Sequence, residues 1–304
     1  MNTKNLFATI LTNDAPSSNY RGESELNRTV LQKITKRGKD GVGFEYPIVS
    51  PESMRNALRE ILAARGLPMN RKRLHNEDQL AVEFKAFPNA AEYADDFLFG
   101  FMVADPKAVK ENKKLPSKRD SLLRMNLALG LLPYRFDATF HQSPKNAGDK
   151  PPWKNAATSA LFHREIAYTP FQYPFALNLA DCMAHPNGAK WTQELLAAIA
   201  ELSGVAGGHA RSYFEMAPRS IVARLSSSLV GGYDSYGFDE TGNFSELDRI
   251  SEQDLPGKEF WVGGAIVRDM SSERKSRLEA AGVHLFDSPQ RLLSKLASIA
   301  FQEQ

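Results

Sequence analysis

Short apolar segments with the length of strands alternate irregularly with amphipathic helical segments along this chain, and this pattern limits the fold more than any other feature. Apolar runs or period-two alternation predict strands over 6–11, 96–103, 121–132, 162–179, 220–230, 260–267 and 283–286. Helical spacing predicts helices over 191–202, 272–281 and 289–301. No strand–GxGxxG–helix unit is present, which argues against a dinucleotide-binding fold. The order predicts an α+β sheet with helices on one face.

The clearest helix begins at Ser50. A serine can cap the first free amides, and Pro51 suits the first helical position. Apolar side chains then recur at helical spacing, and Gly66 and Pro68 end the segment. Arg55 and Arg59 are four residues apart, so we expect them on one face of this helix.

Several segments outside these elements are polar and basic. Residues 17–39 show no sustained period, and 106–119 reads as a basic loop. Residues 136–155 contain prolines and glycine and lie between the predicted strands 121–132 and 162–179, so the three segments predict a long hairpin.

Composition limits the function classes. The chain has 304 residues with 42% hydrophobic ones, enough for a sizeable core. No apolar run approaches the roughly 18 residues of a membrane span, and the first residues do not resemble a signal peptide. Cys182 is the only cysteine, so no intramolecular disulfide can form. We therefore expect a cytoplasmic protein without a membrane partner.

Charge is unevenly distributed. Residues 1–73 carry 13 Lys and Arg against 7 Asp and Glu, and residues 105–154 carry 11 against 5. The rest carries 14 against 24, so two basic blocks lie on an acidic body. This pattern indicates contact with a polyanion, or a basic face that meets an acidic face of an identical neighbour.

The usual signatures of an active site are missing. The six histidines show no pairing at metal-ligand spacing, and neither a Walker loop nor a GxSxG motif is present. On the predicted strand, Asp95 and Asp96 would point to opposite faces, which favours a structural role. Asp14 is the one carboxylate to watch, although it also suits a turn before Pro16. We expect no catalytic residue, no metal and no cofactor.

Residues 13–73 carry the strongest functional signal. They combine hydroxyl, amide and guanidinium groups with one ring that can stack, a mixture that suits phosphate and 2′-hydroxyl contact. Aromatic-rich strands that read bases are missing, so we expect recognition of the RNA backbone. The candidates here are Ser17, Asn19, Tyr20, Arg21, Asn27, Arg28, Lys33, Arg37, Arg55, Arg59, Asn70, Arg71 and Arg73.

Two later segments add candidates. The turn Gly207-Gly208-His209 with Arg211 can bring backbone amides close to phosphate. In residues 136–163, Lys145, Lys150 and Lys154 can meet phosphates, and Phe140 and Trp153 are candidate wedges between bases. A loop of this length is uncommon in a compact domain unless it is functional.

The chain resembles the DevR family of CRISPR-associated proteins. The run from Asn13 to Glu25, followed by Asn27-Arg28-Thr29, carries the resemblance most specifically. Residues 46–50 and 55–59 support it, as do residues 122–134 and 162–181. Family members are backbone subunits of type I Cascade complexes, particularly I-B-like ones.

The resemblance implies a fold and partners. The expected fold is one ferredoxin-like, RNA-recognition-type palm over 1–304, with finger insertions and the first helix in 13–120, a thumb hairpin at 136–163 and a C-terminal extension at 260–304. The expected partners are CRISPR guide RNA, target DNA through pairing with the guide, further copies of the chain and other Cascade subunits.

Three alternatives remain open. The first is a metal-dependent RNA-cleaving backbone subunit of a type III-like complex that uses Asp14. The second is a self-assembling protein without nucleic acid. The third is a DNA-binding regulator, for which no helix-turn-helix with a basic second helix is present.

Overall fold

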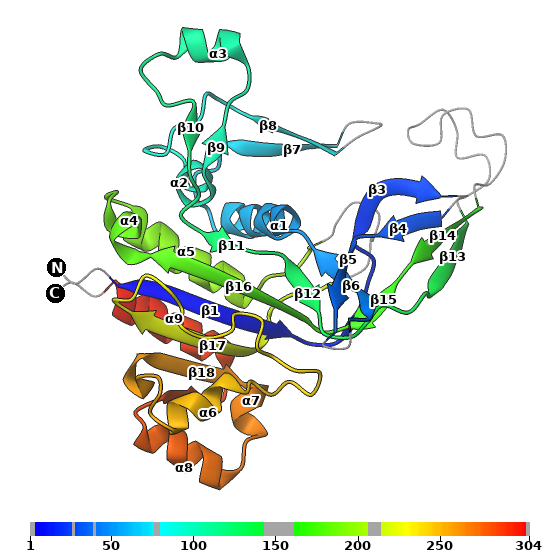
Figure 1. Ribbon diagram of the computed structural model, residues 1–304. Helices are drawn as coiled ribbons and strands as arrows, with labels where there is room; N and C mark the ends of the chain where they lie inside the picture. The colour runs from blue at the N-terminus through cyan, green and yellow to red at the C-terminus, as the bar shows by residue number, and fades with distance from the viewer. Residues whose placement is uncertain are drawn as a thin grey trace.

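The computed structural model describes residues 4–25, 28–38, 41–75, 80–142, 161–205 and 214–301. Within these residues, nine strands form one large sheet whose main path is β19-β18-β17-β1-β16-β12-β6-β5, with β11 also paired to β16 (Figure 1). Its central strands are β1 (Asn5–Thr12), β11 (Arg124–Met125), β12 (Ala128–Gly130), β16 (Phe171–Asn178) and β17 (Pro218–Ser226).

These strands and two helices make a βαββαβ unit. Along the chain the order is β1, α1 (Pro51–Ala64), β11 with β12, β16, α5 (Gly188–Ala200) and β17. In space the order is β17, β1, β16, then β11 and β12, and each neighbouring pair is antiparallel. This is the ferredoxin-like arrangement, so the predicted α+β fold class is confirmed.

One face of the sheet packs against helices. Leu6, Ala8 and Ile10 of β1 share a core with side chains of α1, α5 and α9 (Pro289–Ala300). A second core lies where the C-terminal segment of the chain packs against the sheet. It contains Val222 of β17 together with buried side chains of α6 (Glu246–Ser251). The helices therefore cover one face, and the second core covers the other face around β17, β18 (Phe260–Gly264) and the end of β1 at Leu11.

The remaining elements are insertions and a C-terminal extension. Between β1 and α1 lie β2 (Ala15–Ser17), β3 (Tyr20–Glu25), β4 (Arg28–Leu31), β5 (Lys33–Arg37) and β6 (Gly43–Val49). Between α1 and β11 lie β7 (Arg71–His75), β8 (Leu80–Phe84), α2 (Ala94–Phe99), β9 (Phe101–Met102), α3 (Pro106–Glu111) and β10 (Lys118–Arg119). Between β12 and β16 lie β13 (Ala138–Gln142), β14 (Leu161–Glu165) and β15 (Ala167–Thr169).

The other elements follow β16. A short helix, α4 (Leu179–Met183), precedes α5. After β17 and α6 come η1 (Gly257–Glu259), β18, α7 (Ala265–Arg268), α8 (Ser272–Ala280), β19 (His284–Phe286) and α9. Strands β18 and β19 extend the sheet beyond β17, so the C-terminal segment belongs to the same sheet.

The helix expected from Ser50 is confirmed. The hydroxyl of Ser50 accepts a hydrogen bond from the backbone amide of Ser53 at 3.2 Å, as a capping residue does. Met54, Leu58 and Leu62 are fully buried against the sheet. The helices expected over 191–202, 272–281 and 289–301 correspond to α5, α8 and α9.

The strand predicted over 96–103 is wrong. Residues 94–99 form α2, whose residues are all buried, and Asp95 and Asp96 lie in its first turn. The chain then turns at Gly100, which adopts a φ of 65° and touches the backbone at Arg119, so only residues 101–102 become strand. The short apolar run fits either element, and tertiary packing decides it.

Other boundaries also differ. The basic loop expected at 106–119 contains α3, whose first amides are capped by Asp105. The strand expected over 260–267 ends at Gly264, because a φ of 98° there starts α7. The strands expected over 121–132 and 162–179 are each interrupted, and residues 17–39, which showed no period, contain β3, β4 and β5.

Candidate nucleic-acid interface

The open part of the sheet carries a groove of about 650 Å³. Side chains alternate along a strand, so Phe7 faces away from the helices that cover Leu6 and Ala8. Phe7, Pro174 and Ala176 contribute apolar surface to the groove. Polar groups around it come from the start of α1, from the segment around β11 and from the loop after β17: Arg55, Asp120, Ser121, Arg124, Asn126 and Ser235. The lining therefore includes two arginines and one carboxylate.

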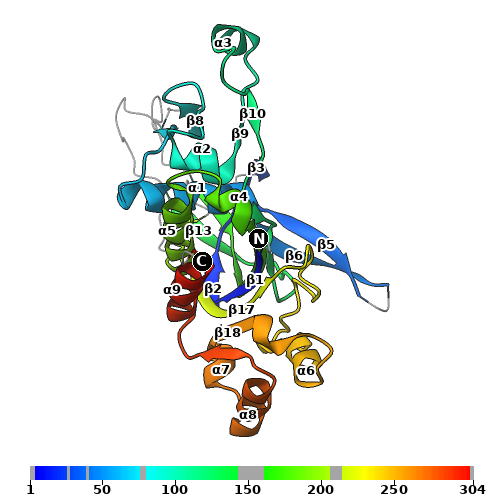
Figure 2. The ribbon, with the colours of Figure 1, turned by 90° about the vertical axis from the view of Figure 1, so that its left-hand side faces the viewer.

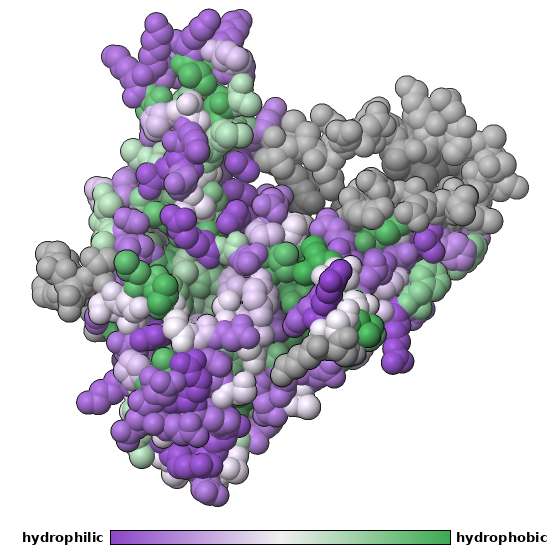
Figure 3. All heavy atoms as spheres, in the orientation of Figure 1, coloured by the Kyte–Doolittle hydropathy of each residue, from purple (hydrophilic) through white to green (hydrophobic). Residues whose placement is uncertain are grey.

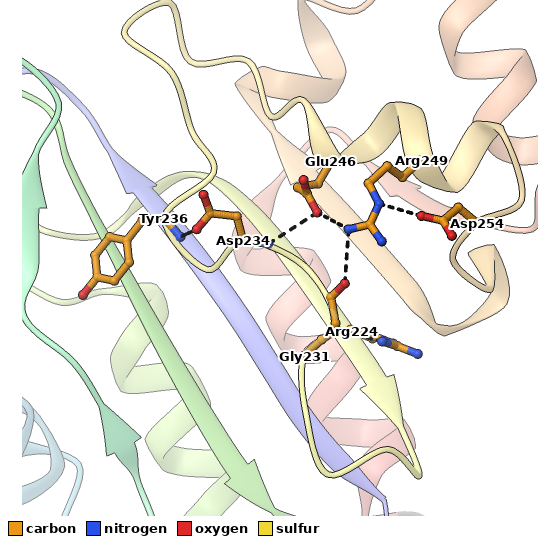
Figure 4. A network of polar contacts seen from close by, with 8 residues as sticks. Arg224, Gly231, Asp234, Tyr236, Glu246, Arg249 and Asp254 are labelled. Atoms are coloured by element: carbon orange, nitrogen blue, oxygen red, sulfur yellow. Dashed lines mark hydrogen bonds and ion pairs between the residues drawn. The ribbon is translucent and has the colours of Figure 1, made fainter. Parts of the chain in front are cut away.

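The loop after β17 forms one wall and is fixed by polar contacts. The hydroxyl of Tyr236 donates to the carbonyl of Leu127 at 2.8 Å, and Thr9 donates to the carbonyl of Ser235 at 3.0 Å. At the base of the loop, Arg224 donates to the carbonyl of Gly231 at 2.7 Å (Figure 4). The wall therefore has a defined position relative to the sheet.

Beyond this loop, one arginine of α6 forms ion pairs with two carboxylates. Arg249 pairs with Glu246 at 2.7 Å and with Asp254 at 2.6 Å, and Glu246 also accepts from the amide of Asp234 (Figure 4). This network connects the loop to the C-terminal part of the molecule.

Three of the predicted arginines gather at one end of the groove. Arg55 lines the groove and donates to the carbonyl of Leu123 at 3.4 Å. Burial lowers the pKa of Arg55, and the neighbouring Arg71 lowers it further, although Glu52 opposes this. Burial and the positive charges of Arg71 and Arg55 lower the pKa of Arg59 to about 10, although the negative charges of Asp95 and Asp96 oppose this shift. The positive charge of Arg71 therefore disfavours the charged forms of Arg55 and Arg59, and nearby carboxylates offset part of this effect.

Arg59 has a structural role as well. Its side chain is only 8% exposed, its guanidinium lies 4.6 Å from the ring centre of Phe99, and it donates to Asn56 at 3.0 Å. Arg71 lies in the same way on Phe84, at 5.0 Å. These aromatic supports fix the positions of both cations.

Asn70 is a fully buried residue that organises the fold. Its side chain donates to Asp96 at 2.8 Å and its backbone amide donates to Asp95 at 2.8 Å. Burial raises the pKa of Asp96, while the hydrogen bonds from Asn70 and Asn89 oppose this shift. The structural role expected for the two aspartates is confirmed, but it arises from a helix rather than a strand.

Candidates in the first insertion mostly join strands to one another. Ser17 and Asn19 are each 4% exposed and donate to the carbonyls of Ala167 and Ile48. Arg28 pairs with the buried Glu165 at 3.2 Å, and Glu165 also accepts from the amide of Leu31. These contacts connect the first insertion to β14 and β15.

The other candidates have varied positions. Lys33 pairs with Glu45 at 3.1 Å and lies over the ring of Tyr134, and Arg37 is exposed in β5. Phe140 is 58% exposed in β13. Tyr20 and Arg21 belong to β3, and Arg73 belongs to β7. Outside the described residues lie Asn27, Lys145, Lys150, Trp153, Lys154, Gly207, Gly208, His209 and Arg211.

Sequence reasoning missed Arg124, Asn126 and Ser235. A signal was available for Arg124, because Leu123 and Met125 on either side are buried. Alternation along a strand places Arg124 on the opposite, open face.

The described residues contain no group of three or more His, Cys, Asp or Glu that could hold a metal ion. Asp14 is exposed just after β1. In the same part of the chain, no helix has the length and apolar character needed to cross a bilayer.

Comparisons with known proteins give consistent results. A family model described as CRISPR-associated negative auto-regulator DevR/Csa2 matches residues 10–187. A CRISPR-associated protein Cas7/Cst2/DevR from Myxococcus xanthus (strain DK1622) is 28% identical over 293 residues, which cover 92% of each chain.

Solved structures show the same fold. A chain of a CRISPR RNA-guided surveillance complex, pre-nicking, superposes with a TM-score of 0.60 at 13% identity and covers 98% of this chain and 100% of its own. A chain of a second CRISPR RNA-guided surveillance complex superposes with a TM-score of 0.57 at 16% identity and the same coverage.

Proposed function

The chain belongs to the DevR/Csa2 family of CRISPR-associated proteins, and on this basis we propose that it is a guide-RNA-binding subunit of a CRISPR RNA-guided surveillance complex. In this role it holds the guide, presents it for pairing with target DNA, and performs no cleavage. Its partners are the guide, further copies of the chain and the other subunits of the complex, in the cytoplasm.

The observation that carries this proposal is the groove beside an arginine cluster. The open face of the sheet offers an apolar floor with Phe7, and Arg55 and Arg124 bring positive charge to its edge. Sugar and base surfaces can lie on the floor while phosphates meet the guanidinium groups. The charge of Arg71 disfavours the charged forms of Arg55 and Arg59 despite the carboxylates nearby, and a phosphate at this end of the groove would stabilise both.

The groove supports recognition of the RNA backbone rather than of its sequence. Guanidinium groups bind phosphate, which carries no sequence information. Four further candidates lie in the β-strands of the insertions: Tyr20, Arg21, Arg37 and Arg73. They would add contacts to the sugar-phosphate backbone of the same RNA. Ser17, Asn19, Arg28 and Asn70 would act by positioning these strands, since their side chains bond to other parts of the chain.

The insertions would take the roles of fingers and thumb around one palm domain. The two insertions that flank α1 within residues 13–120 are the proposed fingers, and the hairpin β13–β14 with the residues between its strands is the proposed thumb. Phe140, which is exposed on β13, would press between bases in this role. The C-terminal extension from residue 260 adds β18 and β19 to the palm sheet.

Binding of single-stranded RNA at increasing salt tests this proposal. Two short RNAs of unrelated sequence should bind with similar affinity, and the logarithm of the binding constant should fall with the logarithm of salt concentration by about 0.7 per contacted phosphate. A strong preference for one sequence, or binding that is insensitive to salt, would contradict backbone recognition.

The same assay separates the non-catalytic role from cleavage through Asp14. Complementary RNA paired with a bound guide should remain intact in the presence of Mg²⁺. Site-specific cuts that disappear in Asp14→Ala would instead identify an RNA-cleaving subunit.

A further inference from the structure

We propose that two oppositely charged surfaces at opposite ends of the chain dock one copy onto the next. The first is the basic arm, residues 103–119, and the second is the acidic surface, residues 234–254. The inference rests on the proposed function in one respect: several copies are expected to follow one guide RNA. It assigns the surfaces through which those copies touch.

The basic arm projects from the body of the molecule. The arm begins directly after β9 and ends with β10, which pairs with β9, and α3 lies at its tip, with no buried residue in that helix (Figure 1). The arm carries six Lys and Arg against two acidic residues. Lys107, Lys110, Lys113, Lys114 and Lys118 are all exposed, and none of them takes part in an ion pair within the described part of the chain. The arm contributes little to a core, so its exposed charge is available to a partner.

The acidic surface surrounds α6 and the loop before it. It carries seven Asp and Glu against one basic residue, Arg249, which Glu246 and Asp254 neutralise. Among the other carboxylates, Asp248 pairs with Arg274 of α8 at 2.8 Å. Four exposed carboxylates have no ion pair among the described residues: Asp234, Asp239, Glu240 and Glu252. A cationic partner would compensate this charge.

The two surfaces cannot meet within one chain. In both views of the ribbon α3 lies at one end of the molecule, and α6 lies toward the other end, with the central sheet between them (Figures 1 and 2). Hydrophilic side chains gather at both ends in the space-filling view (Figure 3). When two complementary patches lie at opposite ends, each copy can bind a neighbour on either side, and such a head-to-tail contact extends into a series.

Charge complementarity favours a second copy over nucleic acid as the occupant. Nucleic acid could neutralise the arm but would be repelled by the acidic surface. A neighbouring copy accounts for both surfaces with one contact, since the arm has a net charge of +4 and the acidic surface a net charge of −6. Such a contact guides docking and sets orientation more than it adds affinity, and it weakens with salt.

Charge-reversal variants test this contact in the RNA-free, full-length protein. The arm variant is Lys113→Glu with Lys114→Glu, and the surface variant is Glu240→Lys with Glu252→Lys. All four side chains are exposed, and none takes part in an ion pair of the described residues. Lys190→Glu with Lys295→Glu is the control, because it changes the net charge as much as the arm variant does, on exposed faces of α5 and α9.

Sedimentation velocity should give a clear pattern. At low salt the unmodified protein and the control should form species larger than dimers, and high salt should disperse them. Each variant alone should weaken association by about tenfold or more, because the net charge of the arm falls from +4 to 0 in one and that of the acidic surface falls from −6 to −2 in the other. An equal mixture of the two variants should form dimers but no longer series, since the unmodified arm of one variant still meets the unmodified acidic surface of the other, whereas the two altered surfaces, with net charges of 0 and −2, do not attract.

Other outcomes would overturn the inference. These are an unmodified protein that stays monomeric or stops at two copies at low salt, or an equal mixture of the two variants that forms no dimer. If the arm variant loses affinity for a short RNA that holds one copy, the arm is a nucleic-acid surface instead. If the unmodified protein binds no RNA but the association pattern appears, the proposed function fails while this contact stands.

Discussion

Arg55 and Arg59 lie one helical turn apart on α1, yet their surroundings differ. Arg55 reaches the groove and makes one hydrogen bond, to the carbonyl of Leu123. Arg59 is nearly enclosed, lies over the ring of Phe99 and bonds to Asn56. The same residue type on the same helix face is therefore accessible from the groove in one position and packed into the fold in the next.

Alanine substitutions should separate these roles. Arg55→Ala should weaken RNA binding by about tenfold, since it removes one charge-assisted contact, with little change in stability. Arg59→Ala should lower the free energy of unfolding by about 1–3 kcal/mol, because it removes a packed and hydrogen-bonded side chain. RNA titrations and urea unfolding measure the two effects.

Arg65→Ala provides the matched control on the same helix. Arg65 pairs with Glu194 and Glu201 of the α5 region and does not line the groove. RNA affinity should therefore stay unchanged in this variant. An equal loss of affinity in Arg65→Ala and Arg55→Ala would indicate a general charge effect and not a contact in the groove.

The residue types in the sequence indicated contact with RNA, but they did not indicate which side chains are free to make that contact. Asn70 bonds to Asp95 and Asp96, which lie 25 and 26 residues farther along the chain. Glu165 lies 134 residues beyond Leu31, whose backbone amide it binds. Such long-range partners occupy Asn70 and Glu165 inside the fold. A local sequence pattern does not reveal such long-range partners. Residues that position the strands therefore could not be distinguished from residues that could contact RNA.

At the scale of elements, the hairpin β13–β14 depends on the first insertion. Strand β14 pairs with β4 in parallel, and the buried Glu165 joins the two strands through Arg28 and the amide of Leu31. Because Glu165 is only 2% exposed, its charge needs these partners. The segment with the most specific family resemblance thus supports the proposed thumb.

Glu165→Ala should destabilise this junction by about 1–3 kcal/mol, because it leaves the buried amide of Leu31 without its acceptor. Hydrogen exchange should rise in β4 and β14 but not in α1. For comparison, Glu45→Ala removes an exposed carboxylate that pairs with Lys33 and should cost less than about 1 kcal/mol. Equal effects of the two substitutions would show that the junction does not hold the hairpin.

The residues between β13 and β14 should be needed for ordered assembly but not for folding. Gln142 and Leu161 are cross-strand partners, so an Asn-Gly turn can replace residues 143–160 and still close the hairpin. The shortened protein should unfold at a similar temperature and bind short RNA, but it should lose regular stacking along a long guide. Electron microscopy of complexes of the shortened protein with a long guide checks this. If bases are still displaced at regular intervals, the thumb lies elsewhere, and residues 105–119 are the next candidate.

The elements themselves were predicted unevenly. The capped helix α1 and the strand β1 follow directly from local signals, because capping and burial agree there. Helix α2 could not be predicted in this way, because the six apolar and acidic residues before Gly100 suit a strand equally well. Its hydrogen bonds with Asn70 come from a distant part of the sequence. The short insertion strands are defined by their pairing partners, which no local pattern reveals.

At the scale of the whole molecule, the sheet separates three surfaces. The open face carries the groove, and the basic arm and the acidic surface lie at opposite ends. The segregation of charge along the sequence indicated a polyanion or an identical neighbour as partner, and our two proposals assign these partners to separate surfaces. Local patterns predicted an α+β sheet, whereas the ferredoxin-like strand order was expected only from the family resemblance.

The RNA that co-purifies with the tagged, full-length protein from its native host tests the central claim most directly. Sequencing should yield small RNAs of uniform length whose ends derive from CRISPR repeats and whose central parts differ, because the groove holds backbone without reading bases. Protein free of nucleic acid, or bound to random cellular RNA of mixed length, would contradict the account.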